Sequence, residues 1–282
     1  MNNNDIQSMY GLKYNPFLPD IPKEAIYSLP GSDSFELRIR SMAAQGGFAL
    51  ITGDPGLGKS KTLHKMVCNL ADIPDLAVGV MQRPQSRLGD FYRELGELFN
   101  VALSPANRYG GFKILRERWI HHCQSTLFKP VLLIDEAQHV SDECLTELRI
   151  LQSNQFDSQN LLFTVLCGDN RLPERFRSPD LLPLGSRIGP RLLLEPLNPE
   201  QLQDYLRFAL EQAGNSQLMT DGLIRTLASH AANNLRVLNH MAAELLNAAY
   251  IKELSRIDES LFFELFSPSR SQPNRNRKVN MQ

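Results

Sequence analysis

The eight residues from Gly53 to Ser60 could bind phosphate. They follow the pattern of a Gly, four variable residues and then Gly-Lys-Ser, which is typical of nucleotide phosphate-binding loops. Such a loop points backbone N–H groups at phosphate oxygens, and the helix that follows presents its positive end to the same anion. Lys59 would place a charge at the β- and γ-phosphates of ATP, and the Ser60 hydroxyl would ligate Mg²⁺. The predicted ATP contacts are Gly53, Asp54, Pro55, Gly56, Leu57, Gly58, Lys59, Ser60 and Lys61.

The residues on either side of this loop supply the strand and the helix that it requires. Residues 48–52 form a run with strand-forming character directly before the loop. Leu63, Met66, Val67 and Leu70 follow it with the spacing of an amphipathic helix. The sequence therefore predicts a strand, a phosphate-binding turn and a helix in succession.

Two adjacent carboxylates form the second motif. The apolar residues 131–134 predict a buried strand, and Asp135 and Glu136 follow it directly. Ligands of open parallel sheets bind beyond the carboxyl ends of the strands. Asp135 would hold Mg²⁺ through water, and Glu136 would orient and polarise the water that attacks the γ-phosphate. A further predicted strand, at 76–81, lies between the two motifs, unlike NTPases whose two motif strands are consecutive in sequence.

Two polar residues follow the predicted strand at 161–167. Either Asp169 or Asn170 could point between the carboxylates and the γ-phosphate, and the sequence does not choose between them.

Two arginines that lie far from both motifs in the sequence are candidates for contacts with the nucleotide. Arg187 is predicted to act as a finger that reaches the nucleotide of a neighbouring subunit and offsets charge in the transition state, with Arg191 as the second choice. Arg236, at the start of a predicted helix, would reach back to the phosphates of its own subunit. The alternative for each is an ordinary surface charge.

The elements that must position these residues alternate between strand and helix patterns up to about residue 195. This alternation predicts a parallel sheet covered by helices on both faces. The predicted strands are residues 48–52, 76–81, 131–134, 161–167 and 191–194. Helices are predicted at 86–100 and 112–127, and Ser141 is predicted to cap another.

Only helix patterns follow residue 198. Asn198, Pro199 and Gln201 form a strong helix-start signal. Later helices are predicted at 220–232, 235–254 and 258–266. The tail at 267–282 carries basic but no acidic residues and is expected to be disordered.

Composition limits where the protein could act. The 282 residues carry a formal net charge of −1, so binding to nucleic acid or membranes would need local patches. The sequence contains no apolar run long enough to span a bilayer and no secretion signal at its start. The cysteines, which form no C-x-x-C pair, are predicted to be reduced core thiols: Cys68, Cys123, Cys144 and Cys167. A cytoplasmic location without membrane partners is expected.

Taken together, these motifs resemble those of AAA+ ATPases over about residues 8–266. More closely, they resemble the ExeA-like and TniB-like branch, which contains secretion-associated ATPases and regulatory ATPases of transposons. The segments that carry this resemblance are Met9-Tyr10-Gly11-Leu12, Asn15-Pro16-Phe17, Ile26-Tyr27, Gly47 to Gly53 and Asp135-Glu136-Ala137-Gln138.

The resemblance implies the α/β fold of an AAA+ P-loop NTPase. In this fold, helices flank a parallel five-stranded sheet, and an all-helical lid follows at the C-terminal end. The expected divisions are a lead-in at 1–30 near the adenine, the nucleotide-binding domain at 31–197, the lid at 198–266 and the tail at 267–282. Ile26 and Tyr27 become candidate contacts of the base. Two departures from the family pattern are Asn234 and Leu235, which replace a Gly and a Pro before Arg236, and the acid Asp169 at the first-sensor position.

The secretion members of this branch carry a membrane span and a cell-wall-binding domain after the ATPase, and this sequence shows neither, which favours the transposition-regulator type. A resemblance to such regulators, which are similar to MuB, TnsC and IstB, implies that this protein is an ATPase that oligomerises as a ring or filament on double-stranded DNA. They recruit a transposase, in some cases with a target-selection protein. The alternative is a cytoplasmic ATPase module of a secretion or cell-envelope complex that does not bind DNA. A helicase is disfavoured because the helical remainder leaves no room for a second RecA-like domain.

Binding to DNA would need exposed basic side chains that contact phosphates. The candidates are Arg83, Arg87, Arg108, Lys113, Arg116 and Arg118.

Overall fold

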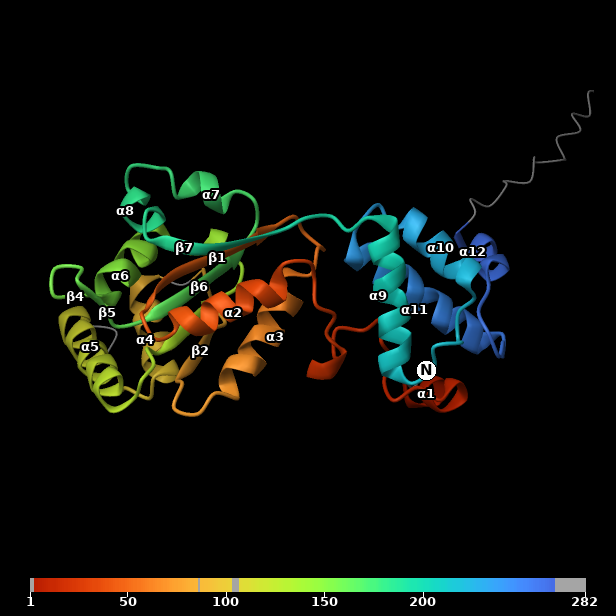
Figure 1. The fold of residues 1–282 in the computed structure, drawn as a ribbon, viewed down its shortest axis with the longest axis horizontal. Coiled ribbons are helices and arrows are strands. Elements are labelled where there is room, and N and C mark those ends of the chain that lie inside the picture. Colours follow the sequence, from red (N-terminus) through yellow and green to blue (C-terminus); the bar gives the residue numbers. More distant parts are fainter. Residues whose placement is uncertain (1–2, 86, 103–106, 267–282) are drawn as a thin grey trace, which may run out of the picture.

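The computed structural model describes residues 3–85, 87–102 and 107–266 (Figure 1). A sheet flanked by helices makes up one end of an elongated molecule, and a cluster of helices makes up the other. The predicted disordered tail at 267–282 lies outside the described residues.

The sheet has five parallel strands, as predicted. Their order across the sheet is β2-β3-β6-β1-β7, so that β6 separates the two motif strands β1 and β3. The strands are β1 (Gly47–Gly53), β2 (Val78–Met81), β3 (Val131–Ile134), β6 (Phe163–Gly168) and β7 (Ile188–Leu194). Because all five run the same way, the residues after β1, β3 and β6 meet at one edge of the sheet.

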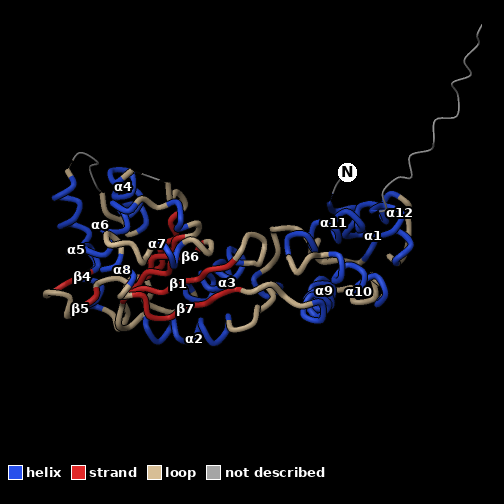
Figure 2. The backbone as a smooth tube through the Cα atoms, turned by 90° about the horizontal axis from the view of Figure 1, so that it is seen from above, coloured by secondary structure: helices blue, strands red, loops and turns tan. Residues whose placement is uncertain are grey.

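Helices cover both faces of this sheet, because its central strands are apolar on both sides (Figure 2). In β1, Ala49 and Ile51 pack with one layer, whereas Phe48 and Leu50 pack with the other. The first layer contains α2 (Ser32–Met42) and α3 (Lys59–Ala71). The second contains α4 (Leu88–Leu98), α5 (Arg108–Ser125) and α6 (Asp142–Gln152).

Several local elements differ from the sequence prediction. Helix α5 begins four residues before the predicted start at 112, since the Asn107 side chain accepts a hydrogen bond from Gly110 N at 2.8 Å and caps the helix. Strand β7 begins at Ile188 rather than at Arg191. The elements without a sequence prediction are α1 (Asn3–Tyr10), α2, η1 (Lys23–Ala25), η2 (Ala137–His139), β4 (Ser153–Asn154), β5 (Gln159–Asn160), α7 (Leu172–Arg175) and α8 (Leu182–Gly185).

The helical part follows β7, where the sequence pattern changes. The Asn198 side chain accepts from Gln201 N at 2.8 Å while Gln201 returns a bond to Asn198 N at 2.9 Å, which is the predicted start signal. The helices are α9 (Pro199–Ala213), α10 (Asp221–His230), α11 (Leu235–Ile251) and α12 (Glu259–Phe266). Of all helices in the described residues, none combines the length and the apolar character needed to cross a bilayer.

The N-terminal segment belongs to both parts of the molecule. Helix α1 lies beside the helical part in both views (Figures 1 and 2), where Lys13 N donates to Ala213 O at 2.8 Å. The chain then crosses to the sheet, and Leu29 joins the core between them. This path places residues 16–29 along the boundary where the site described below is found.

Candidate functional site: a nucleotide cavity between the sheet and the helical part

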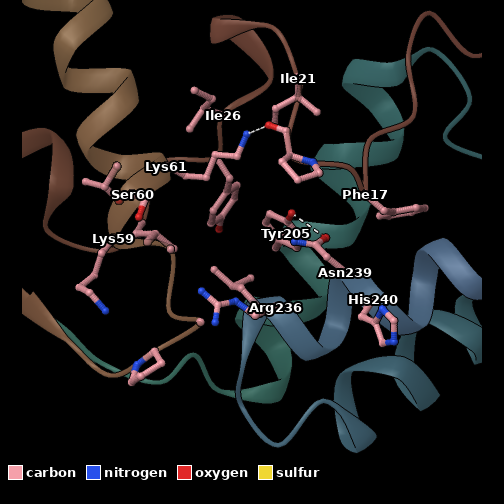
Figure 3. Close-up of a pocket in the computed structure, with 18 of the residues that line it drawn as sticks. Phe17, Ile21, Ile26, Lys59, Ser60, Lys61, Tyr205, Arg236, Asn239 and His240 are labelled. Carbon is pink, nitrogen blue, oxygen red and sulfur yellow. Dashed lines mark hydrogen bonds between the residues drawn. The ribbon is translucent and has the colours of Figure 1, made fainter. Parts of the chain in front are cut away.

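A cavity of about 760 Å³ lies where the N-terminal segment, the phosphate loop and the helical part meet (Figure 3). Its volume falls within the range of small-molecule and cofactor sites. The lining includes Lys59, Ser60, Glu136 and Arg236, which the sequence had separated by up to 177 residues (59 to 236). Ile26 and Tyr27 also line it, so one cavity contains residues predicted for the phosphates, the hydrolysis and the base.

The phosphate loop has the backbone conformation that anion binding requires. Gly56 and Gly58 have φ angles of 88° and 97°, where a side chain would be strained. The N–H groups of Gly56, Gly58, Lys59 and Ser60 donate to no described residue. Together with the positive end of the 13-residue helix α3, they form a cradle of unpaired donors.

Lys59 is held close to this loop. Its side chain is almost wholly buried, at 7% exposure, and its ammonium donates to Gly53 O at 2.9 Å and Asp54 O at 3.0 Å. An anion in the cradle would offer the buried charge a stronger acceptor than these carbonyls. Lys61, the last predicted contact of the loop, instead donates to Pro19 O in the N-terminal segment, and burial lowers the pKa of Lys61.

The carboxylates after β3 differ in their surroundings. Asp135 is half-buried and accepts from Glu136 N at 2.9 Å, whereas Glu136 is exposed and lines the cavity. Glu136 has a φ of 50° and a ψ of 38°, a left-handed conformation that is strained for a non-glycine residue. Gln138, which carried no predicted role of its own, donates from Nε2 to Glu136 Oε2 and accepts from Asp169 N at 3.2 Å. Gln138 therefore ties the predicted catalytic carboxylate to the end of β6.

The two candidates after β6 lie in different places. Asn170 donates to the Asp54 side chain at 2.6 Å and so contacts the phosphate loop. Asp169 lines the cavity but pairs with Arg171, whose Nε donates to it at 2.8 Å. The Arg171 hydrogen bond is the main cause of a lowered pKa at Asp169, which keeps this group ionised. This pairing favours Asn170 as the neutral donor, and Arg171 is a cavity cation that the sequence analysis missed.

Aromatic and lid residues complete the end of the cavity away from the phosphate loop. Tyr27 packs edge-on against Tyr205 with ring centroids 5.6 Å apart, and Tyr205 donates to Asn239 Oδ1 at 2.9 Å (Figure 3). Burial raises the pKa of Tyr205. Phe17, from the lead-in that the resemblance places near the adenine, also lines the cavity. Tyr205, Asn239 and His240 line it without a sequence prediction, because their periodicity marks them only as helix residues. Arg236 faces the start of α3 across the cavity, and its guanidinium donates to no described residue.

Arg187 lies far from the cavity of its own chain. It precedes β7, and Ile188 pairs with Phe48 at the amino end of β1, whereas the phosphate loop leaves the carboxyl end. Its guanidinium pairs with Asp157 in the β4–β5 turn and donates to Pro183 O. Arg191 is an exposed residue within β7. Any contact of Arg187 with a nucleotide would therefore be with that of another subunit.

The donor set suits a hard divalent cation beside a phosphate. Ser60 supplies a hydroxyl at the cavity wall. Asp135 supplies a carboxylate directly after β3, which β6 separates from β1 in the sheet. Mg²⁺ prefers such oxygen ligands. Cys167 lies against Asp135 from β6, and burial raises the pKa of its thiol well above the ordinary value, with Asp135 adding to the effect.

Comparisons with known proteins address the fold that carries this site. Residues 42–176 match the family model described as an AAA domain. The structure superposes on Cdc6p from Pyrobaculum aerophilum with a TM-score of 0.66, 17% identity and coverage of 86% of this chain and 67% of that one. It superposes on domain III of the Thermotoga maritima replication initiation protein DnaA with a TM-score of 0.59, 21% identity and coverage of 88% and 96%. The fold is that of an AAA+ P-loop NTPase.

The chain is also similar in sequence to a curated protein. The chain is 30% identical over 217 residues to general secretion pathway protein A of Aeromonas hydrophila. The match covers 75% of this chain but spans only 39% of the length of that protein. The likeness to these two solved structures, at 17% and 21% identity, shows the AAA+ fold alone.

The candidate DNA contacts are in different environments within the AAA+ fold. Arg83 and Arg87 are exposed beyond the end of β2, where Arg83 lines a second cavity of about 1070 Å³ that also touches Glu136. Lys113 is exposed but lies near Glu117. Arg116 donates to Leu151 O at 2.9 Å and to Asn154 Oδ1 at 2.9 Å, so it fastens the β4–β5 hairpin. Arg118 donates to Phe99 O at 3.4 Å, and the side chain of Arg108 is outside the described residues.

Proposed function

We propose that this protein binds ATP with Mg²⁺ and hydrolyses it to ADP and phosphate. The observation that carries the proposal is the convergence of Lys59, Ser60, Glu136 and Arg236 on one cavity. In this mechanism the unpaired loop N–H groups and Lys59 bind the β- and γ-phosphates, and Glu136 orients a water and takes up its proton. A bound Mg²⁺, held by Ser60 and by Asp135 through water, would neutralise phosphate charge.

We also propose that hydrolysis takes place in a homo-oligomer, either a ring or a filament. Arg187 supports this proposal because it lies at the amino end of the strands, whereas its own phosphate loop follows the carboxyl end of the neighbouring strand β1. A guanidinium from a neighbour would stabilise the charge that develops on the γ-phosphate. Arg236 would act within its own subunit, because it already lines the cavity.

The favoured biological role is regulation of DNA transposition, with ATP-dependent assembly on double-stranded DNA and recruitment of a transposase. Two proteins of the same fold were solved with DNA, the Drosophila origin recognition complex and the ORC1 protein of Aeropyrum pernix. In this chain, exposed Arg83 and Arg87 offer phosphate contacts, and Arg116 is excluded by its role in the hairpin. A target-selection protein would be a further partner of such an assembly.

A second role is favoured by the match to general secretion pathway protein A. In that case the chain would be the ATPase module of a secretion or cell-envelope complex, with partners on other chains. The ATPase activity would then be indifferent to DNA.

A titration with double-stranded DNA separates the two roles. Binding would be measured at two salt concentrations with ATP and Mg²⁺, with ADP and without nucleotide, alongside ATP turnover with and without DNA. Cooperative, salt-sensitive binding only with ATP supports the DNA role, because phosphate contacts release counterions. ATP turnover without binding to DNA under any condition would reject the DNA role and favour the secretion role. Absence of both nucleotide binding and turnover would reject the ATPase proposal itself.

A further inference from the structure

Asn234, at the start of α11, joins the helical part directly to the phosphate loop. Its Nδ2 donates to Pro55 O at 2.9 Å. Its Oδ1 accepts from Arg236 N at 3.0 Å and from Val237 N at 3.3 Å, which caps α11. Only this orientation of the amide satisfies all three bonds, because the oxygen accepts and the nitrogen donates. One side chain therefore both starts the lid helix and holds a carbonyl of the loop.

The backbone strengthens this contact. Arg236 N also donates to Gly56 O at 3.2 Å, so two successive carbonyls of the loop, at Pro55 and Gly56, bond to the first turn of α11. A Cβ on Gly56 would lie 2.3 Å from Asn234 Oδ1, so the approach requires glycine at this position. The N-terminus of α11 and the phosphate loop are thus in direct contact within a single chain.

Holding the Pro55 carbonyl also sets the direction of the next N–H group. The carbonyl and the amide of a trans peptide point in opposite directions, and none of the described peptides is cis. With its carbonyl bonded to Asn234, the Pro55–Gly56 peptide turns the Gly56 N–H away from the start of α11. That N–H donates to no described residue and is one of the unpaired donors of the cradle.

We propose that Asn234 is a positioning residue for nucleotide binding: through the Pro55 carbonyl it fixes the phosphate loop so that the Gly56 N–H can donate a hydrogen bond to a phosphate oxygen. This inference rests on the proposed ATP binding. It assigns a role to the residue at which the chain departs from the family pattern of a Gly and a Pro before the arginine. Affinity for the phosphates is then higher when the lid is docked than when it is not.

The test compares two variants that keep the cap but lose the donor. Ser and Asp both cap helices well, so N234S and N234D should keep α11 intact while removing the amide that holds Pro55. N233D is the matched control, since Asn233 is exposed, has a φ of 57° that Asp tolerates, and its side chain bonds to no described residue. ADP and ATP dissociation constants, KM, kcat and the melting temperature without nucleotide would be measured for full-length proteins.

We expect N234S and N234D to weaken the binding of both nucleotides by up to roughly tenfold, as for the loss of one hydrogen bond. KM should rise while kcat and the melting temperature stay near those of the parent and of N233D. Unchanged or tighter binding by N234S would overturn the inference. Weakening by N234D and N233D alone would also overturn it, because charge repulsion would explain the result. If the parent binds no nucleotide, the proposed ATP binding fails rather than the role of Asn234.

Discussion

Replacing Glu136 by Gln should slow ATP hydrolysis by a factor of about 10² to 10⁴ and leave ATP binding intact. The change removes the proton acceptor but keeps the shape of the side chain. Gln can still accept the bond from Gln138 Nε2 through its own Oε1. In free-energy terms the barrier should rise by about 2.7 to 5.4 kcal/mol.

Folding should be almost unaffected by the same substitution. The Glu136 side chain is exposed, and Gln adopts the left-handed backbone at 136 with the same strain as Glu. We therefore expect the free energy of unfolding to change by less than about 0.5 kcal/mol. Any loss of activity would then report on chemistry rather than on folding.

The assay is phosphate release at saturating ATP, paired with equilibrium binding of ATP. Glu97 provides a matched control, because it is an exposed carboxylate on α4 that lines the same second cavity as Glu136. E97Q removes an equal charge and should turn over like the parent. Turnover of E136Q at the parental rate would refute the assignment of Glu136 as the base.

Three further outcomes are expected. Lys59→Ala should weaken ADP binding by about a hundredfold in calorimetry, because a charge-assisted contact to phosphate is lost; parental affinity would contradict the cradle. Glu136→Gly should raise the unfolding free energy by about 1 kcal/mol in urea while abolishing turnover, since glycine relieves the φ of 50°; unchanged stability would contradict the strain. Burial lowers the pKa of His122, whose Nε2 has no partner among the described residues. As the pH falls, the unfolded chain therefore binds a proton at His122 before the folded chain does. The free energy of unfolding should then decrease as the pH drops below about 6.5. His122→Gln should reduce that loss between pH 7.5 and 5.5 in urea titrations, and an equal loss in both proteins would contradict it.

Much of the sheet was predictable because its signals are local. The runs at 48–52 and 131–134 are apolar and short, and they are followed by phosphate-binding and acidic motifs. They become β1 and β3, with the predicted buried strand at 131–134 matching residue for residue. The helical part was equally clear, because a capping pattern at 198 depends only on neighbouring residues.

The hairpin of β4 and β5 shows where local signals fail. Its turn places Gln155, Phe156 and Asp157 in left-handed conformations without a glycine. Arg116 of α5 holds the hairpin by donating to Ser153 O and Asn154 Oδ1, and Arg187 pairs with Asp157. These contacts join residues about 30 to 40 positions apart (116 to 154 and 157 to 187), so no nearby pattern could reveal them.

The sequence by itself predicted the chemistry of the phosphate loop and of the carboxylate pair, because both predictions depend on spacing within a few residues. Only the tertiary structure decided which distant groups join them. It placed Asn170 on the phosphate loop, paired Asp169 with Arg171, and brought Asn234 to the Pro55 carbonyl across 179 positions of the chain. The physical reason is that these contacts depend on how the helical part packs against the sheet, which is settled by the burial of a shared core rather than by any local pattern.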